Sequence, residues 1–141
     1  MYDTFKPAQP MGLMDFVKAA KAAIKEVSAD QAEQMMRERA DVLVVDVRES
    51  SEHEQGHLGQ ALLVPRGILE AAADPAYPKH NPEFTAARGR PVIVYCATGG
   101  RSAMAAAVMQ MMGFKEVYSL ASGFAGWEQA GKPVTREARY V

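Results

Sequence analysis

The sequence has little cysteine: Cys96 is the only one among 141 residues. A single thiol excludes an internal disulfide bond, and it excludes a zinc or iron–sulfur site built from several cysteines. Cys96 is therefore a small buried apolar side chain, a residue without a particular role, or a reactive thiol.

An excess of charge of one sign is also missing, as are long apolar runs. Sixteen Lys and Arg against seventeen Asp and Glu give a net charge of −1. We therefore expect no nucleic-acid partner, because such binding depends on basic residues. No uncharged run reaches about 18 apolar residues, and lysines such as Lys18 and Lys21 interrupt any N-terminal secretory signal. Together with the free thiol, these absences predict a cytoplasmic protein without a membrane partner.

Apolar residues make up 48% of the chain, enough for the core of one domain. Residues 1–12 indicate an irregular leader, and the apolar residues from Leu13 to about Glu26 recur every three or four positions. That spacing predicts an amphipathic helix on the flank of the domain. We divide the chain into a leader and flanking helix, 1–26, and a domain, 27–141. We expect a monomer, because no second apolar surface is evident.

The rest of the chain alternates between two kinds of segment. Four have the composition of strands: 42–46, 61–64, 92–96 and 117–120. Five have the spacing or the start signals of helices: 28–39, 68–73, 83–88, 101–112 and 123–130. Continuous β-branched runs are typical of strands that are covered on both faces. The alternation therefore predicts an α/β fold, a doubly wound parallel sheet of about four to five strands with helices on both faces.

Cys96 stands where such sheets bind ligands, beyond the carboxyl end of a strand. The residues after it are Ala97, Thr98, Gly99, Gly100 and Arg101, followed directly by a predicted helix. The two glycines allow a tight turn whose N–H groups point inward, and a helix N-terminus adds roughly half a positive charge. We expect this loop to form an anion-binding nest, with Cys96 as the catalytic residue and residues 97–101 as the substrate-binding ones.

In that setting the Cys96 thiol is expected to ionise at neutral pH. A free cysteine titrates near ~8.5, and comparable placements lower this value to about 3.5–7.5. Arg101 adds a permanent positive charge, whereas no His, Asp or Glu lies in the loop to act as a base. Activation is therefore expected to be electrostatic, which suits a thiolate that attacks sulfur.

Two residues on the same rim are predicted to support the site. Asp46 ends the neighbouring strand and accepts hydrogen bonds either from the loop and Arg101 or from its own turn. Arg66 follows another strand end, where it either attracts an anionic donor or is simply solvated. We expect Arg48 and Glu49 to form a surface or intra-loop pair.

The three histidines suggest neither a metal site nor a cofactor site. His53 and His57 have the i, i+4 spacing of helical metal ligands, but Gly56 argues against a helix between them. We therefore predict no metal and no cofactor.

Several short motifs occur in the order and spacing of single-domain rhodanese-like sulfurtransferases. They are the segments 44–49, 56–58, 96–102 and 123–127, together with Ala61, Val64 and Pro65. The sequence resembles this family from about Val27 to Pro133. The resemblance implies that Cys96 takes a sulfane sulfur from a small donor such as thiosulfate and holds it as a persulfide. A thiol, cyanide or a protein acceptor then removes the sulfur.

The sequence departs from the two-domain thiosulfate enzymes near the cysteine. Those enzymes carry basic residues where Ala97 and Thr98 stand here, and an arginine about where Glu52 falls. Without these charges a thiosulfate dianion should bind weakly, and Arg101 must do most of the holding. The resemblance therefore leaves room for another persulfide as the donor.

Two other functions stay open. Cysteine-based phosphatases and arsenate reductases use a similar loop, but Cys96 and Arg101 enclose four residues, one fewer than in those enzymes. A shorter loop suits one sulfur atom better than phosphate. The other alternative is a non-enzymatic interaction module or sulfur relay. Inactive relatives usually lack the cysteine, so its presence here favours a chemical role. Turnover with small thiols would distinguish an enzyme from a relay.

Overall fold

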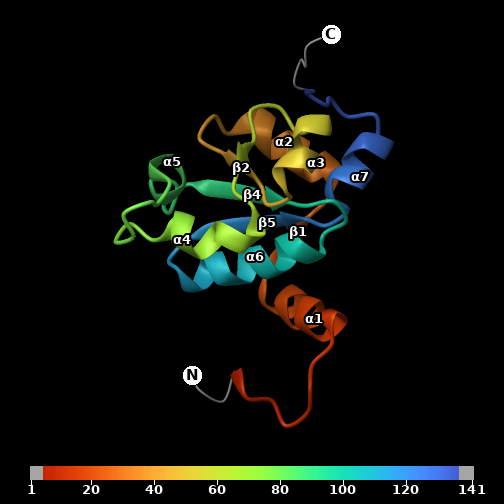
Figure 1. Cartoon of the computed structure of the whole chain (residues 1–141). Coiled ribbons are helices and arrows are strands. Elements are labelled where there is room, and N and C mark those ends of the chain that lie inside the picture. Colours follow the sequence, from red (N-terminus) through yellow and green to blue (C-terminus); the bar gives the residue numbers. More distant parts are fainter. Residues whose placement is uncertain (1–4, 137–141) are drawn as a thin grey trace.

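The computed structural model describes residues 5–136, whose centre is a parallel sheet between two layers of helices (Figure 1). The sheet has five strands in the order β1-β5-β4-β2-β3. Their bounds are β1 (Lys25–Val27), β2 (Leu43–Asp46), β3 (Leu62–Leu63), β4 (Pro91–Tyr95) and β5 (Glu116–Leu120). All four neighbouring pairs are parallel, which confirms the predicted α/β fold.

Helices cover both faces of the sheet (Figure 1). On one side lie α4 (Leu69–Ala73), α5 (Pro82–Thr85) and α6 (Gly100–Met111), with the short 3-10 helix η2 (Arg66–Ile68) before α4. On the other side lie α2 (Ala29–Glu38), α3 (Ser50–Gln55) and α7 (Gly123–Gln129). The helix α1 (Leu13–Ala23) lies outside these layers.

Strand β4 shows how the sequence sorts its residues between the two layers. Val92 and Val94 pack in the core on the side of α4, α5 and α6, and Cys96 continues that face. Ile93 and Tyr95 pack in the core on the side of α2 and α7. Successive residues of a strand point to opposite faces. Cys96 is therefore directed toward α6.

The prediction of one helix from Leu13 to about Glu26 was wrong at its C-terminal end. The helix ends at Ala23, and Lys25–Val27 is an edge strand that pairs with β5, Lys25 opposite Tyr118. This strand crosses the boundary that we placed between 26 and 27. Such a short strand depends on pairing with a segment far along the chain, which the local spacing of apolar residues does not reveal.

The sequence prediction also missed α3. None of its residues is buried, so it has no apolar stripe from which a helix could be recognised. The helix is stabilised at its start, where the Glu49 N–H donates to Glu52 Oε1 at 3.0 Å. The helix ends at Gln55 with Gly56 as its C-cap, so His53 lies in the helix and His57 lies beyond it.

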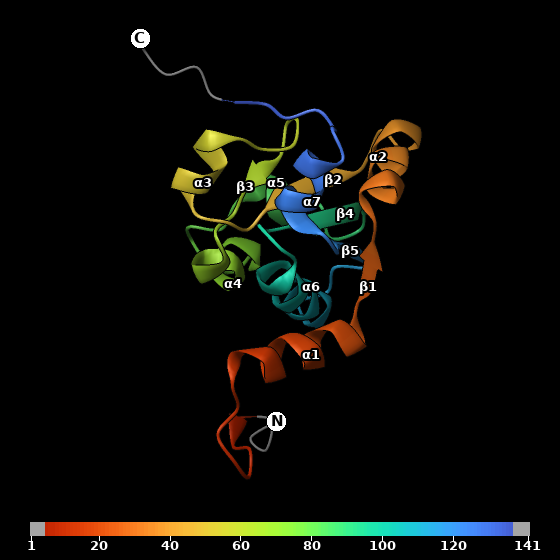
Figure 2. The ribbon, with the colours of Figure 1, turned by 90° about the vertical axis from the view of Figure 1, so that its right-hand side faces the viewer.

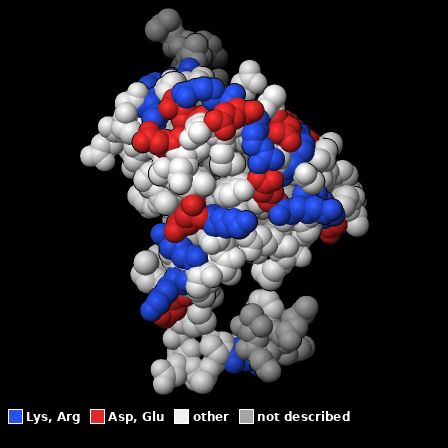
Figure 3. Space-filling view, turned by 180° about the vertical axis from the view of Figure 1, so that it is seen from behind, with Lys and Arg blue, Asp and Glu red and all other residues white. Residues whose placement is uncertain are grey.

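Helix α1 packs against α6, on the side away from the sheet (Figure 2). It buries only Val17 and Ala20, while Leu13 and Met14 are 69% and 68% exposed. Seen from behind, the body carries acidic and basic side chains beside one another (Figure 3). Within residues 5–136, no helix is long and apolar enough to cross a membrane.

Candidate active site

The loop after β4 depends on a glycine at one position. Gly99 precedes α6 with a φ of 106°, and a Cβ there would lie 2.5 Å from the carbonyl oxygen of Ala121. A side chain is therefore excluded both by the backbone conformation and by the neighbouring chain. The start of α7 holds the loop from the other side, because the Phe124 N–H donates to the Cys96 carbonyl at 2.8 Å.

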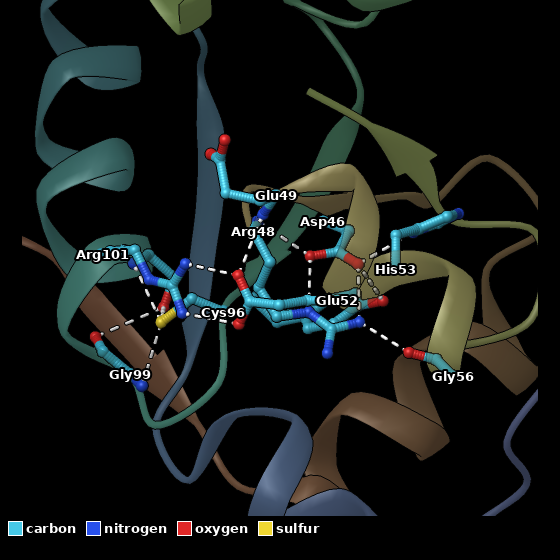
Figure 4. A network of polar contacts seen from close by, with 11 residues as sticks. Asp46, Arg48, Glu49, Glu52, His53, Gly56, Cys96, Gly99 and Arg101 are labelled. Carbon is cyan, nitrogen blue, oxygen red and sulfur yellow. Dashed lines mark hydrogen bonds and ion pairs between the residues drawn. The ribbon is translucent and has the colours of Figure 1, made fainter. Parts of the chain in front are cut away.

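Hydrogen-bond donors converge on the sulfur of Cys96, as the sequence predicts (Figure 4). The backbone N–H groups of Gly99 and Ser102 lie 3.1 and 3.4 Å from Sγ. Sγ also lies 3.5 Å from Ser102 Oγ, which donates to the Gly99 carbonyl at 3.3 Å. When the thiol loses its proton, the Ser102 hydroxyl can turn and donate to sulfur instead.

Ser102 was missed as a site residue, because the predicted substrate-binding residues stop at Arg101. The signal that could have found it is the helix start. The first N–H groups of a helix have no partner within it, and Ser102 supplies the third of them after the cap. Its hydroxyl is also within 2.8 Å of Ser119 Oγ on β5, which fixes its place beside the sulfur.

The environment of Cys96 has two opposing effects on its pKa. Burial alone raises the pKa, but hydrogen bonds from Ser102 and from the N–H groups of Gly99 and Thr98 outweigh it. The result is a pKa below the ordinary value of a cysteine, in the direction expected for an anion nest at a helix N-terminus.

Cys96 is only 1% exposed, yet it is not sealed in the core. It lines a pocket of about 320 Å³ at the N-terminal end of α6. The other lining residues are Leu13, Met14, Val17, Lys21, Thr98, Gly100, Arg101 and Met104. This pocket gives a small reagent a route to the thiol.

Arg101 lies at the same pocket, but its guanidinium already has a partner (Figure 4). Two of its nitrogens donate to the two carboxylate oxygens of Glu52, at 2.9 and 3.0 Å. This pairing raises the pKa of Arg101 and lowers that of Glu52. Glu52 is on α3, the helix that the sequence did not reveal, so the pair was not predicted. The arginine expected to hold an anionic donor is neutralised by a carboxylate.

Asp46 takes part in a different buried network. Its carboxylate accepts hydrogen bonds from Arg48 Nε and Nη2 at 2.9 and 2.8 Å, from Tyr95 Oη at 3.0 Å, and contacts His53 Nδ1 at 2.9 Å. Burial opposes ionisation, but Arg48 and His53 lower the pKa of Asp46 below its ordinary value. The Arg48 N–H also donates to Asp46 Oδ1 at 3.0 Å, which is the contact within its own turn that we considered, and the supporting role of Asp46 stays a prediction.

The expectation of a surface or intra-loop pair between Arg48 and Glu49 was wrong for Arg48. This side chain is only 4% exposed, binds Asp46 and donates to the Gly56 carbonyl at 2.7 Å. Its guanidinium lies 4.5 Å from the centre of the Phe124 ring. The buried carboxylate of Asp46, two residues earlier, attracts the arginine inward, because an unpaired buried charge is strongly unfavourable.

The remaining candidates lie away from the thiol. Arg66 pairs with Glu70 at 2.9 Å and does not line the pocket of Cys96, so its supporting role stays a prediction. The rings of His53 and His57 stack with their centres 3.9 Å apart. In the described part of the chain, no three His, Cys, Asp or Glu side chains are grouped so that they could hold a metal ion.

Comparison with known families agrees with this geometry. The model of the rhodanese-like domain matches residues 28–130. The chain belongs to the single-domain rhodanese family. It is 29% identical over 111 residues to a sulfurtransferase of Allochromatium vinosum, which covers 79% of this chain and 94% of that protein. It is 32% identical over 104 residues to the thiosulfate sulfurtransferase GlpE of Coxiella burnetii, covering 74% of this chain and 87% of GlpE.

A solved structure extends the likeness to the N-terminal part of this chain. It belongs to a protein of unknown function from Rhodopseudomonas palustris, described as a possible tyrosine phosphatase. The two chains are 31% identical with a TM-score of 0.82, over 92% of this chain and 98% of the other. Because the family model begins at residue 28, so large a coverage includes part of the segment before it, where α1 lies.

Proposed function

We propose that this rhodanese-like protein is a sulfurtransferase in which Cys96 carries the sulfur as a persulfide. The thiolate attacks the outer sulfur of a donor such as thiosulfate, and a new S–S bond forms. The old S–S bond breaks, and its electron pair leaves with sulfite. An acceptor thiolate or cyanide then attacks the outer sulfur of the persulfide and regenerates the Cys96 thiolate.

One observation carries this proposal: the N–H groups of Gly99 and Ser102 point at the Sγ of Cys96, a residue that lines a pocket. Both the thiolate and the persulfide are anions, so the same donors stabilise the resting state and the intermediate. No proton has to move when sulfur is attacked. The lack of a base in the loop is therefore consistent with the reaction.

The pairing of Arg101 argues against the phosphatase alternative. A phosphatase of this loop type uses its arginine to hold the oxygens of phosphate, whereas here Glu52 occupies two guanidinium nitrogens. Two negative charges, the carboxylate and a phosphate, would then compete for one cation. The four-residue spacing between Cys96 and Arg101 points the same way.

The test is the mass of the intact protein after incubation with thiosulfate and with an organic sulfane-sulfur donor. We expect an addition of one sulfur atom, removed by cyanide, and no addition in Cys96→Ser, whose folding is checked by its circular dichroism. An unchanged adduct in Cys96→Ser, or no adduct from any donor, would contradict the proposal. Hydrolysis of p-nitrophenyl phosphate without sulfur transfer would support the phosphatase. Turnover with small thiols distinguishes an enzyme from a relay that serves only a protein acceptor.

A further inference from the structure

One side of the Cys96 pocket is built by α1, which lies outside the matched family model. Leu13, Met14 and Val17 line it from this helix, and Met104 lines it from α6. Helices α1 and α6 are packed side by side in both ribbon views (Figures 1 and 2). The thiol therefore shares this pocket with an apolar wall that is supplied mainly by α1.

This wall is only partly covered. Leu13 and Met14 are 69% and 68% exposed, whereas Val17 is buried against the start of α6. Covering exposed apolar side chains is favourable in proportion to the area removed from water. The volume of about 320 Å³ falls at the lower end of small-molecule sites. A compound with a small apolar body would fit this space beside the sulfur.

The charges around the pocket disfavour a highly charged donor. Arg101 is paired with Glu52, and Lys21, the other cation at the pocket, has Glu26 at 3.5 Å. A thiosulfate dianion would approach the Glu52 carboxylate without an unpaired arginine to compensate. A donor with one negative charge suffers less repulsion.

We propose that this pocket selects organic sulfane-sulfur donors that carry one apolar substituent and at most one negative charge. Leu13 and Met14 determine that preference by contacting the substituent. This inference rests on the proposed function, because it names the substrate class of the same thiol.

The transfer balances without a further reactant. With a thiosulfonate, R–SO₂–S⁻, the Cys96 thiolate attacks the terminal sulfur, and the Cys96 S–S bond forms. The donor's own S–S bond breaks, and its electron pair leaves with the sulfinate R–SO₂⁻. Two negative charges enter the reaction and two leave it, so no oxidant, reductant or proton is needed.

The test compares two thiosulfonates of equal charge, benzenethiosulfonate and methanethiosulfonate, with thiosulfate as a third donor. The quantity measured is kcat/KM for persulfide formation on Cys96 in the full chain. For the wild type we expect benzenethiosulfonate to exceed methanethiosulfonate by about tenfold, the discrimination typical of a small apolar contact. In Leu13→Ser and Met14→Ser, this ratio should fall by about threefold or more, mainly through KM.

Phe16→Ser is the matched control, because Phe16 is on the same helix, 50% exposed and not part of the pocket lining. It should keep the wild-type ratio. An unchanged ratio in Leu13→Ser and Met14→Ser, or an equal fall in Phe16→Ser, would overturn the inference while sulfur transfer persists. No persulfide from any of the three donors would instead overturn the proposed function. Thermal melting of each variant checks that α1 is still folded onto α6.

Discussion

Replacing Glu52 by glutamine should improve the use of thiosulfate. In the structure both carboxylate oxygens of Glu52 are occupied by Arg101, at 2.9 and 3.0 Å. Glutamine has nearly the same shape, and its side-chain oxygen can still accept from the Glu49 N–H at the start of α3. The substitution therefore removes one negative charge beside the pocket and leaves the helix cap in place.

The size of the effect follows from exposure and charge. Arg101 and Glu52 are 36% and 34% exposed, so water screens their surroundings strongly. Two unit charges 4 Å apart interact by about 1 kcal/mol in bulk water. Thiosulfate carries two charges but has to lie farther from Glu52 than Arg101 does. We therefore expect a gain of ~1 kcal/mol, about fivefold in kcat/KM.

The assay is turnover of thiosulfate with cyanide as acceptor, at low and at high salt. The gain in Glu52→Gln should appear mainly as a lower KM, and it should shrink as salt screens the charges. Glu49→Gln is the matched control, because it removes the same charge from a carboxylate that points away from Arg101 (Figure 4). An unchanged or lower kcat/KM in Glu52→Gln, or an equal gain in Glu49→Gln, would refute the reasoning.

Two further predictions concern the thiol and the buried carboxylate. The rate of alkylation of Cys96 by iodoacetamide, followed against pH, should have its midpoint below ~8.5, the pKa of a free cysteine. Ser102→Ala should raise this midpoint, since hydrogen bonds from Ser102 lower the pKa of Cys96. A wild-type midpoint at or above ~8.5 would contradict the anion nest. Asp46→Asn should lower the free energy of unfolding by about 3–5 kcal/mol at neutral pH, because it leaves Arg48 buried without its carboxylate. The pKa of Asp46 is lower in the folded than in the unfolded protein. Its ionised carboxylate therefore stabilises the fold fully at pH values above ~3.9, the pKa of an unperturbed Asp, and this stabilisation is lost as the pH falls through the folded-state pKa. The free energy of unfolding, measured with urea at several acidic pH values, should therefore depend less on pH in Asp46→Asn than in the wild type. An equal dependence would show that Asp46 is not the group that causes the loss of stability in acid.

The parts of the fold that could be predicted are those with a strong local pattern. The β-branched runs of β2 and β4 and the glycine-rich start of α6 all lie where the sequence placed them. The parts that were missed lack such a pattern. Lys25–Val27 is a strand only because β5 lies beside it, and α3 is a polar helix without a buried residue. A surface pair was expected at Arg48, since the strand pattern ends at Asp46 and nothing local shows that the arginine after it turns back toward that carboxylate.

The sequence alone predicted the loop whose N–H groups surround Cys96. A lone thiol before Gly99 and Gly100 at a helix start needs only neighbouring residues to form its anion nest, and those neighbours are visible in the sequence. The tertiary structure decided what surrounds the nest. Glu52 meets Arg101 and α1 meets the start of α6 only after the sheet has brought distant segments together. Local backbone geometry follows from adjacent residues, whereas the charge and the apolar wall of the pocket depend on contacts across the folded chain.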